Sequence, residues 1–311
     1  MLGVNIGDLC CDNPWVPKHC LKKLNTDLRE VESIKFFHAN PSKVIPFGVS
    51  KKIKNFYIHL SNPELISTKI WKKWVKTHVK PICNRLVGKN IFLVVGNEVL
   101  ADYNIGKYGP KLLPAMRSCQ RALYDCGIGH VKIVTPLDTS CLQESYPPSA
   151  SRFKPELVPI LKEIVSFMVS SGSKLTFNIY PYFAKQHVTK EFALFGNDPG
   201  YLDKGKSYTD LFSAQYDSVI HAVTKLGVRS SSRLELAVTE TGWPSHGGDM
   251  ASPENTSRYL EGIKNICNHG TPLRRGPKEI LVFELYDENL KTSPDFEKYF
   301  GIFNHRGQGK K

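Results

Sequence analysis

The sequence predicts a single-domain α/β protein of the (β/α)8 TIM-barrel class, and three observations lead to this prediction. Eight short apolar runs alternate with stretches whose apolar residues recur at helical spacing. The chain has 311 residues, a length at which such barrels form one unit, and no linker or low-complexity tract divides it. Two glutamates stand at the polar ends of apolar runs, where barrel strands open onto a site. We place the domain at residues 1–306 and treat residues 307–311 as a basic C-terminal tail.

The eight predicted strands are short runs rich in apolar, β-branched and aromatic residues. They occupy residues 2–6, 33–39, 54–60, 91–97, 130–136, 174–180, 233–239 and 279–286. Helices are predicted between them over residues 64–80, 110–125, 155–170 and 208–226. The third helix is expected to end at Gly172, a residue suited to a left-handed helix cap. The weakest unit is 40–60, where a helix between the second and third strands is hard to find.

Composition and charge describe an ordinary globular chain with a basic surface. Hydrophobic residues make up 41% of the chain and charged residues 23%, and no apolar run approaches the length of a membrane helix. The formal net charge is +13, but the basic residues are scattered, as in residues 71–76, and form no long block. We interpret the charge as a solvated cationic surface or as a means of adhesion to an acidic polysaccharide, and we expect no nucleic-acid partner.

The eight cysteines do not indicate a metal site, because they form no C-x-x-C pair and no cluster with histidine at zinc spacing. Cys119 and Cys126 are seven positions apart on one predicted helix, too far for a disulfide. Most of the cysteines are expected to be buried thiols. A bridge within the group Cys10, Cys11 and Cys20 remains an alternative.

Two glutamates carry the chemistry expected at the mouth of the barrel. Glu98 follows the fourth predicted strand and Glu240 follows the seventh. Because the carboxyl ends of barrel strands meet on one rim, the two carboxylates are expected to converge. Such a pair suits cleavage of a glycosidic bond, with Glu98 as general acid/base and Glu240 as nucleophile. The alternative, that each caps a helix or pairs with a surface cation, is disfavoured because each follows a strand too apolar to face water.

Side chains near the same strand ends predict a cleft for a sugar polymer. Asn97 is suited to hydrogen-bond a sugar hydroxyl, for which we favour the 2-OH. Sugar rings have apolar faces that stack on aromatic side chains, and five such residues follow the last three strands or end them: Tyr180, Tyr182, Phe183, Trp243 and Phe283. For about half of them, Phe283 especially, the alternative is packing in the core. The charged residues Glu288, Lys291 and Glu297 form either a network that tunes the catalytic pair or a set of solvated loop charges.

At these residues the chain resembles the plant endo-1,3-β-glucanases, family seventeen of the glycoside hydrolases. The matching blocks run in order along nearly the whole chain: V-G-N-E-V (95–99), L-L-P-A-M-R (112–117), S-Y-P-P-S-A (145–150), N-I-Y-P-Y-F (178–183), T-E-T-G-W-P-S (239–245) and Y-D-E-N-L-K (286–291). The resemblance implies a (β/α)8 barrel that hydrolyses internal β-1,3 linkages in glucans such as callose or laminarin, with no cofactor and no metal. It also implies retention of anomeric configuration, which requires the two carboxyl groups to lie about 5–5.5 Å apart.

The resemblance matches Glu98 to the acid, Glu240 to the nucleophile, and Glu288, Lys291 and Glu297 to supporting charged residues. The chain departs from the family pattern near its N-terminus. Ile6 replaces a usual tyrosine, and Lys35-Phe36-Phe37-His38 stands where the family often has R-x-Y-D. Two hydroxyls and one carboxylate are therefore absent, and we expect weaker substrate binding by about 1–3 kcal/mol for a lost buried hydroxyl.

Three functional hypotheses follow. The first is a retaining endo-β-1,3-glucanase, the second a catalytically weak β-1,3-glucan-binding protein on the same barrel, and the third a mixed-linkage β-1,3/1,4-glucanase. We expect a monomer without a membrane span, whose partner is a β-1,3-glucan. By resemblance the protein is expected to be secreted, to act in the cell wall or vacuole, and to have a role such as plant defence. The sequon at Asn255 adds weak support for secretion, although the chain opens in the first predicted strand without a leader.

Overall fold

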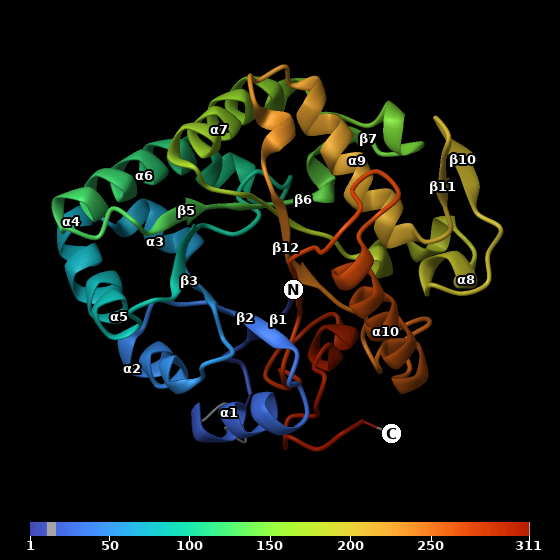
Figure 1. Ribbon diagram of the computed structural model, residues 1–311, viewed down its shortest axis with the longest axis horizontal. Helices are drawn as coiled ribbons and strands as arrows, with labels where there is room; N and C mark the ends of the chain where they lie inside the picture. The colour runs from blue at the N-terminus through green and yellow to red at the C-terminus, as the bar shows by residue number, and fades with distance from the viewer. Residues whose placement is uncertain (11–16, 311) are drawn as a thin grey trace.

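A computed structural model describes residues 1–10 and 17–310, and in it a parallel sheet is wrapped into a barrel with helices outside (Figure 1). All the pairings within this sheet are parallel. Its strands are β1 (Leu2–Ile6), β2 (Val31–Phe36), β3 (Asn55–Leu60), β4 (Asn90–Val95), β5 (Lys132–Val134), β6 (Pro136–Asp138), β9 (Leu175–Asn178), β12 (Leu236–Thr241) and β13 (Ile280–Val282).

The barrel closes through one continuous segment, residues 132–138. The strand order is β5-β4-β3-β2-β1-β13-β12-β9-β6, so the two ends of the order are β5 and β6. These two strands are separated only by Thr135. The first lies within the fifth predicted strand, 130–136, and pairs with β4, whereas β6 continues two residues beyond that prediction and pairs with β9. The eight predicted strands and the barrel class are therefore confirmed.

The helices lie outside the strands. They are α1 (Pro17–Thr26), α2 (Pro41–Val44), α3 (Asn62–Ser67), α4 (Trp71–Trp74), α5 (Lys80–Arg85), α6 (Ile105–Asp125), α7 (Val158–Ser171), α8 (Lys190–Ala193), α9 (Leu211–Lys225) and α10 (Pro253–His269). A π-helical turn, Val75–Val79, joins α4 to α5. The short 3-10 helices are Ile45–Val49, Thr139–Cys141, Pro148–Ala150, Pro155–Leu157, Pro181–His187, Ser231–Arg233 and Asp295–Tyr299.

Most of the predicted helices are confirmed, with different bounds. Helix α7 ends at Gly172, which has a left-handed φ of 60° as expected. The predicted helix 64–80 is instead divided into α3 and a second helix that begins at Trp71. In the weak unit 40–60 only α2 and one 3-10 turn form. Two short hairpins lie outside the barrel, β7 (Leu142–Glu144) with β8 (Arg152–Phe153) and β10 (Tyr201–Asp203) with β11 (Lys206–Tyr208).

The interior of the barrel is closed at the amino ends of its strands. Gly3 on β1 lies between Leu281 on β13 and Ser33 on β2. A Cβ at this position would lie 2.5 Å from Leu281 Cγ and 2.8 Å from Ser33 Cβ, so only glycine fits. The carboxylate of Glu279 is bound by Lys174 at 2.6 Å and by Asn55 at 2.6 Å. This buried polar network closes one end of the barrel and leaves the carboxyl ends of the strands as the place for a site.

The end of the chain, predicted as a tail, is held against the barrel by Lys310. The side chain of Lys310 is 8% exposed, and its ammonium donates to Asp287 Oδ1 at 2.6 Å and to Tyr299 O at 2.8 Å. Among the described residues no helix is long and apolar enough to cross a membrane. Cys83, Cys119, Cys126, Cys141 and Cys267 are buried thiols, whereas the predicted alternative of a bridge involving Cys11 lies outside the described residues.

Candidate active site

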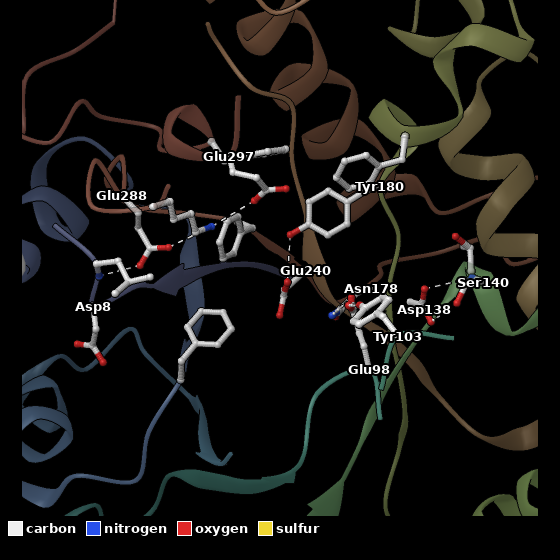
Figure 2. Close-up of a pocket in the computed structure, with 17 residues that line it drawn as sticks. Asp8, Glu98, Tyr103, Asp138, Ser140, Asn178, Tyr180, Glu240, Glu288 and Glu297 are labelled. Atoms are coloured by element: carbon white, nitrogen blue, oxygen red, sulfur yellow. Dashed lines mark hydrogen bonds and ion pairs between the residues drawn. The ribbon is translucent and has the colours of Figure 1, made fainter. Parts of the chain in front are cut away.

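A cavity of about 820 Å³ opens at the carboxyl ends of the barrel strands, and Figure 2 shows its residues. Glu240 lies between Glu98 on one side and Glu288 with Glu297 on the other. The lining side chains are mostly acidic or aromatic: Asp8, Leu9, Phe37, Glu98, Tyr103, Asp138, Thr139, Ser140, Asn178, Tyr180, Phe183, Glu240, Phe283, Glu288, Lys291, Glu297 and Phe300.

Glu240 is held by two partners from other strands. It lies within β12, and its side chain is only 8% exposed. Lys35 of β2, which is fully buried, donates to Glu240 Oε1 at 2.5 Å, and Tyr180 at the end of β9 donates to Oε2 at 3.1 Å. A buried carboxylate with a cation on one oxygen and a phenol on the other is fixed in position.

Glu98 is the second carboxyl group of the predicted pair. It follows β4 after Gly96, and both residues have positive φ, 50° for Glu98 and 67° for Gly96, which turns the chain back so that the carboxyl group faces the cavity. Asn178 donates to Oε1 at 2.8 Å, and the Tyr103 hydroxyl binds Oε2. Burial and the negative charge of Glu240 raise the pKa of Glu98 to about 7, although the bonds from Tyr103 and Asn178 act in the opposite direction. Glu98 is therefore protonated at mildly acidic pH, as a proton donor requires.

Asn178 connects the two glutamates. Its Oδ1 accepts from the hydroxyl of Thr239, the residue before Glu240, at 2.9 Å, while its amide nitrogen donates to Glu98. The same nitrogen donates a longer hydrogen bond, of 3.3 Å, to Asn97 Oδ1. The backbone of Asn97 is held by the side chain of Asn62, which donates to Asn97 O at 2.9 Å and accepts from Asn97 N at 2.8 Å. Asn97 is not among the residues that line the cavity, so the structure places it behind Glu98 as a support.

The charged wall formed by Glu288, Lys291 and Glu297 belongs to the cavity. Lys291 lies 3.2 Å from Glu288 Oε2 and 3.4 Å from Glu297 Oε2. The carboxyl group of Glu284 is also close to Glu288 and is fully buried. Gly7 packs against both carboxyl groups, since a Cβ at this position would lie 2.1 Å from Glu288 Oε1 and 2.2 Å from Glu284 Oε2. Burial and the charge of Glu288 raise the pKa of Glu284 well above its ordinary value, so we expect Glu284 to be protonated.

The five predicted aromatic contacts divide into two groups. Tyr180, Phe183 and Phe283 line the cavity, and Phe183 is 50% exposed. Trp243 and Tyr182 were predicted to contact the sugar, but they are 1% and 2% exposed, pack edge to face with centroids 5.2 Å apart, and lie outside the lining. Aromatic residues that follow a barrel strand can face either the cavity or the core, and the sequence does not show which of the two each ring faces.

Several residues of the site were missed from the sequence. Asp138 and Asn178 each end a barrel strand, so a rule that counts every polar residue at a strand end finds both. The predicted fifth strand stopped at residue 136, which excluded Asp138. Lys35 has a weaker signal, a single cation inside a buried strand. Tyr103 lies on the loop after β4 and has no signal in the sequence, because its contact depends on how that loop folds.

The N-terminal departures have specific surroundings. Ile6 packs in the core, whereas Phe37 lines the cavity with its ring edge to face against Phe283, 5.9 Å between centroids. His38 lies 3.4 Å from Asp8, a carboxylate that lines the cavity from the loop after β1. Although burial alone would raise it, the bonds and charges of His38 and Lys43 hold the pKa of Asp8 below its ordinary value. The cavity therefore has a carboxylate beside His38, but this carboxylate belongs to Asp8 on the loop after β1 and not to the segment after β2.

The sequence and structure both match known proteins. The model of the glycosyl hydrolases family 17 matches residues 2–310. A glucan endo-1,3-beta-glucosidase of Vitis vinifera is 34% identical over 76% of this chain and 69% of its own length. Glucan endo-1,3-beta-glucosidase 11 of Arabidopsis thaliana is 35% identical over 98% of this chain and 74% of its own.

Solved structures agree over the whole length. A β-1,3-glucanase and allergen of Cryptomeria japonica pollen superposes with a TM-score of 0.88 and 31% identity, covering 99% of this chain and 97% of that one. One of two plant β-glucan endohydrolases with distinct substrate specificities superposes with a TM-score of 0.85 and 27% identity, covering 99% of this chain and 98% of that one.

Proposed function

This chain belongs to family 17 of the glycosyl hydrolases, and from that premise we propose that it hydrolyses internal β-1,3-glucosidic linkages of β-glucans such as callose or laminarin. Similarity to glucan endo-1,3-beta-glucosidases over most of the chain supports this activity. The enzyme is a glycoside hydrolase that retains anomeric configuration, as is general in the family.

In the first step of the proposed reaction, Glu240 attacks the anomeric carbon and forms a covalent glycosyl ester. The bond to the leaving oxygen breaks as Glu98 transfers its proton to that oxygen. Lys35 and Tyr180 hold the Glu240 carboxylate in place for the attack. The half of the glucan that carries the new hydroxyl then leaves.

In the second step Glu98, now a carboxylate, takes a proton from water as the water oxygen attacks the anomeric carbon. The ester bond to Glu240 breaks and both glutamates return to their starting forms. The single observation that carries these roles is the pairing in one cavity of Glu98, with its pKa raised to about 7, and Glu240, which is bound to a buried cation. One group is suited to give a proton and the other to attack.

The test is release of reducing sugar from laminarin at mildly acidic pH. We expect Glu240→Ala and Glu98→Gln to lower turnover by about 10³-fold or more while the protein stays folded. Glu163→Gln changes an exposed glutamate that pairs with Arg117 on the outer helices, and it should leave turnover unchanged. Full activity in either active-site variant would overturn the assigned roles.

A second candidate function is suggested by Ile6 and Phe37, where the family usually offers tyrosine. A catalytically weak glucan-binding protein would be depleted by insoluble β-1,3-glucan yet release no reducing sugar. Restoring tyrosine at both positions should then recover activity. Comparing hydrolysis of laminarin with that of a mixed-linkage β-1,3/1,4-glucan decides between the two linkage specificities.

We further propose that the protein is a monomer that acts outside the cytosol, in the cell wall or vacuole, with a role such as defence. The net charge of +13 supports retention by acidic wall polymers. Glycosylation at Asn255 is not part of this proposal, because Asn255 is 6% exposed and its amide donates to Met250 O. Light scattering of the purified chain and fractionation of the source tissue test the two statements.

A further inference from the structure

A second cavity, of about 570 Å³, lies on the outer side of the barrel between the β10–β11 hairpin, α8 and α9. In Figure 1 α8 and the β10–β11 hairpin lie at the edge of the molecule, outside α9. Its volume falls in the range of small-molecule sites. None of its lining residues belongs to the catalytic cavity.

Two tyrosines form an aromatic wall of this cavity. Tyr146 is 66% exposed, and its ring meets that of Tyr201 at 66° with centroids 5.0 Å apart. Tyr201 is itself held, because it stacks on the buried ring of Tyr208 at 5.6 Å and packs against Phe192 at 5.8 Å. The wall is therefore formed in advance, and it presents an open ring of the kind on which the apolar face of a sugar stacks.

The rest of the lining mixes apolar and polar side chains and carries no lysine or arginine. The apolar ones are Ala184, Val188, Phe192, Leu211 and Ala214, and the polar ones are Ser145, His187, Thr189, Asp198 and Gln215. Asp198 and Thr189 are joined by a 2.5 Å hydrogen bond at one side. Gln215 of α9 also lines the cavity, and its Oε1 is buried without a hydrogen-bond partner among the described residues. Rotation of this amide toward the cavity would let it accept from a ligand hydroxyl, since the terminal torsion of glutamine is broad. A lining of aromatic and aliphatic side chains with a few polar groups, one carboxylate and no lysine or arginine suits a neutral sugar, which has apolar faces and hydroxyl edges, better than an anion.

The same two chain segments line both cavities. Asp138, Thr139 and Ser140 face the catalytic cavity, and Ser145 with Tyr146, a few residues on, faces the outer one. Likewise Tyr180 and Phe183 face the catalytic cavity, whereas His187 on the same 3-10 helix faces the outer one. Neighbouring parts of the same two segments therefore line the two cavities.

From these observations we propose that the outer cavity is a second binding site for glucosyl units of the β-glucan polymer, with Tyr146 as its stacking platform. The proposal rests on the proposed function, because that function supplies a polymer long enough to meet both cavities. Glucose units held here anchor the enzyme to the polysaccharide and take no part in bond cleavage.

The test separates binding from catalysis. In a Glu240→Ala background, which does not degrade the polymer, Tyr146→Ala should lower retention on insoluble β-1,3-glucan by about fivefold, whereas Tyr146→Phe should retain the wild-type level. Tyr124→Ala is the matched control, since Tyr124 is 79% exposed at the end of α6, outside both cavities. In the active protein, Tyr146→Ala should slow hydrolysis of insoluble glucan and leave kcat/KM for a short soluble β-1,3-oligosaccharide unchanged.

Equal retention of the Tyr146→Ala and Tyr124→Ala proteins would overturn the second site. A parallel loss of activity on the short oligosaccharide would also overturn it, because Tyr146 would then belong to the catalytic cleft. If the unsubstituted chain cleaves no β-1,3-oligosaccharide but Tyr146→Ala still lowers retention, the proposed hydrolysis fails and the binding site stands.

Discussion

Each oxygen of Glu98 has one partner, and the two partners differ in burial. Asn178 is 2% exposed, whereas Tyr103 is 70% exposed. A hydrogen bond from a phenol favours the carboxylate over the acid, so Tyr103 lowers the pKa of Glu98. Removing the Tyr103 hydroxyl is therefore a way to change the pKa of Glu98 without changing a buried residue.

Tyr103→Phe is expected to raise the pKa of Glu98 above its value of about 7. Since the group must be protonated for the first step, the alkaline limb of the kcat/KM profile on laminarin should move to higher pH. Tyr124→Phe, far from the site, should leave the limb in place. A profile for Tyr103→Phe that overlies the wild type would show that Tyr103 does not act on the acid.

Lys35 is the only ammonium that the described residues place on Glu240, and its side chain is fully buried. Lys35→Met leaves the buried carboxylate without its cation, and we expect kcat/KM on laminarin to fall by about 10²-fold or more. Lys35→Arg keeps the charge, in the form that the family often has here, and should retain more activity than Lys35→Met. Equal activity of the two variants would show that charge at this position is unimportant.

At the scale of elements, the sequence predicted the strands well because each is buried on both faces and reads as a continuous apolar run. It predicted Glu98 and Glu240 for the same reason, since a charged residue at the end of a buried strand lies at the carboxyl end of the barrel, where it can reach the cavity. What it missed depends on contacts between elements. Examples are the packing of Trp243 and Tyr182 into the core and the loop that brings Tyr103 onto Glu98.

The segment after β13 is stabilised by the end of the chain. Burial raises the pKa of Asp287 and lowers that of Lys310, so their ion pair only partly offsets the cost of burying both charges. Lys310→Met leaves Asp287 buried and unpaired, and we expect a loss of about 3 kcal/mol in the free energy of unfolding by urea. Lys298→Met, in a solvent-screened pair with Asp295, should lower the free energy of unfolding much less than Lys310→Met does. Equal losses would show that the end of the chain adds no stability.

For the whole molecule, buried carboxyl groups determine how stability depends on pH. Burial raises the pKa of Glu98 to about 7 and those of Asp210 and Asp217 to about 6. The folded state therefore holds these protons more tightly than the unfolded state, and their contribution is full below pH 4 and lost as pH rises through 6 to 7. His59 acts in the opposite direction, because burial lowers its pKa to about 3 and the unfolded state gains its proton near pH 6.5.

The effect of the three carboxyl groups is expected to exceed that of His59 and of His221, whose pKa burial also lowers, so the melting temperature should rise as pH falls from 7.5 to about 5. Calorimetric scans across that range test this, and Glu98→Gln should make the rise smaller because it removes the group that titrates near pH 7. A melting temperature that is constant or highest at pH 7.5 would contradict the assignment of these shifts.

The catalytic cavity has the opposite charge to the molecule around it. Six of its lining residues are carboxylic acids and one is a lysine, in a chain whose net charge is +13. A polyanion is drawn to the outer surface by long-range attraction and repelled at the cavity mouth, whereas an uncharged polysaccharide meets neither force. We therefore expect that an acidic polymer added to the assay binds the outer surface without competing with a neutral glucan for the cavity.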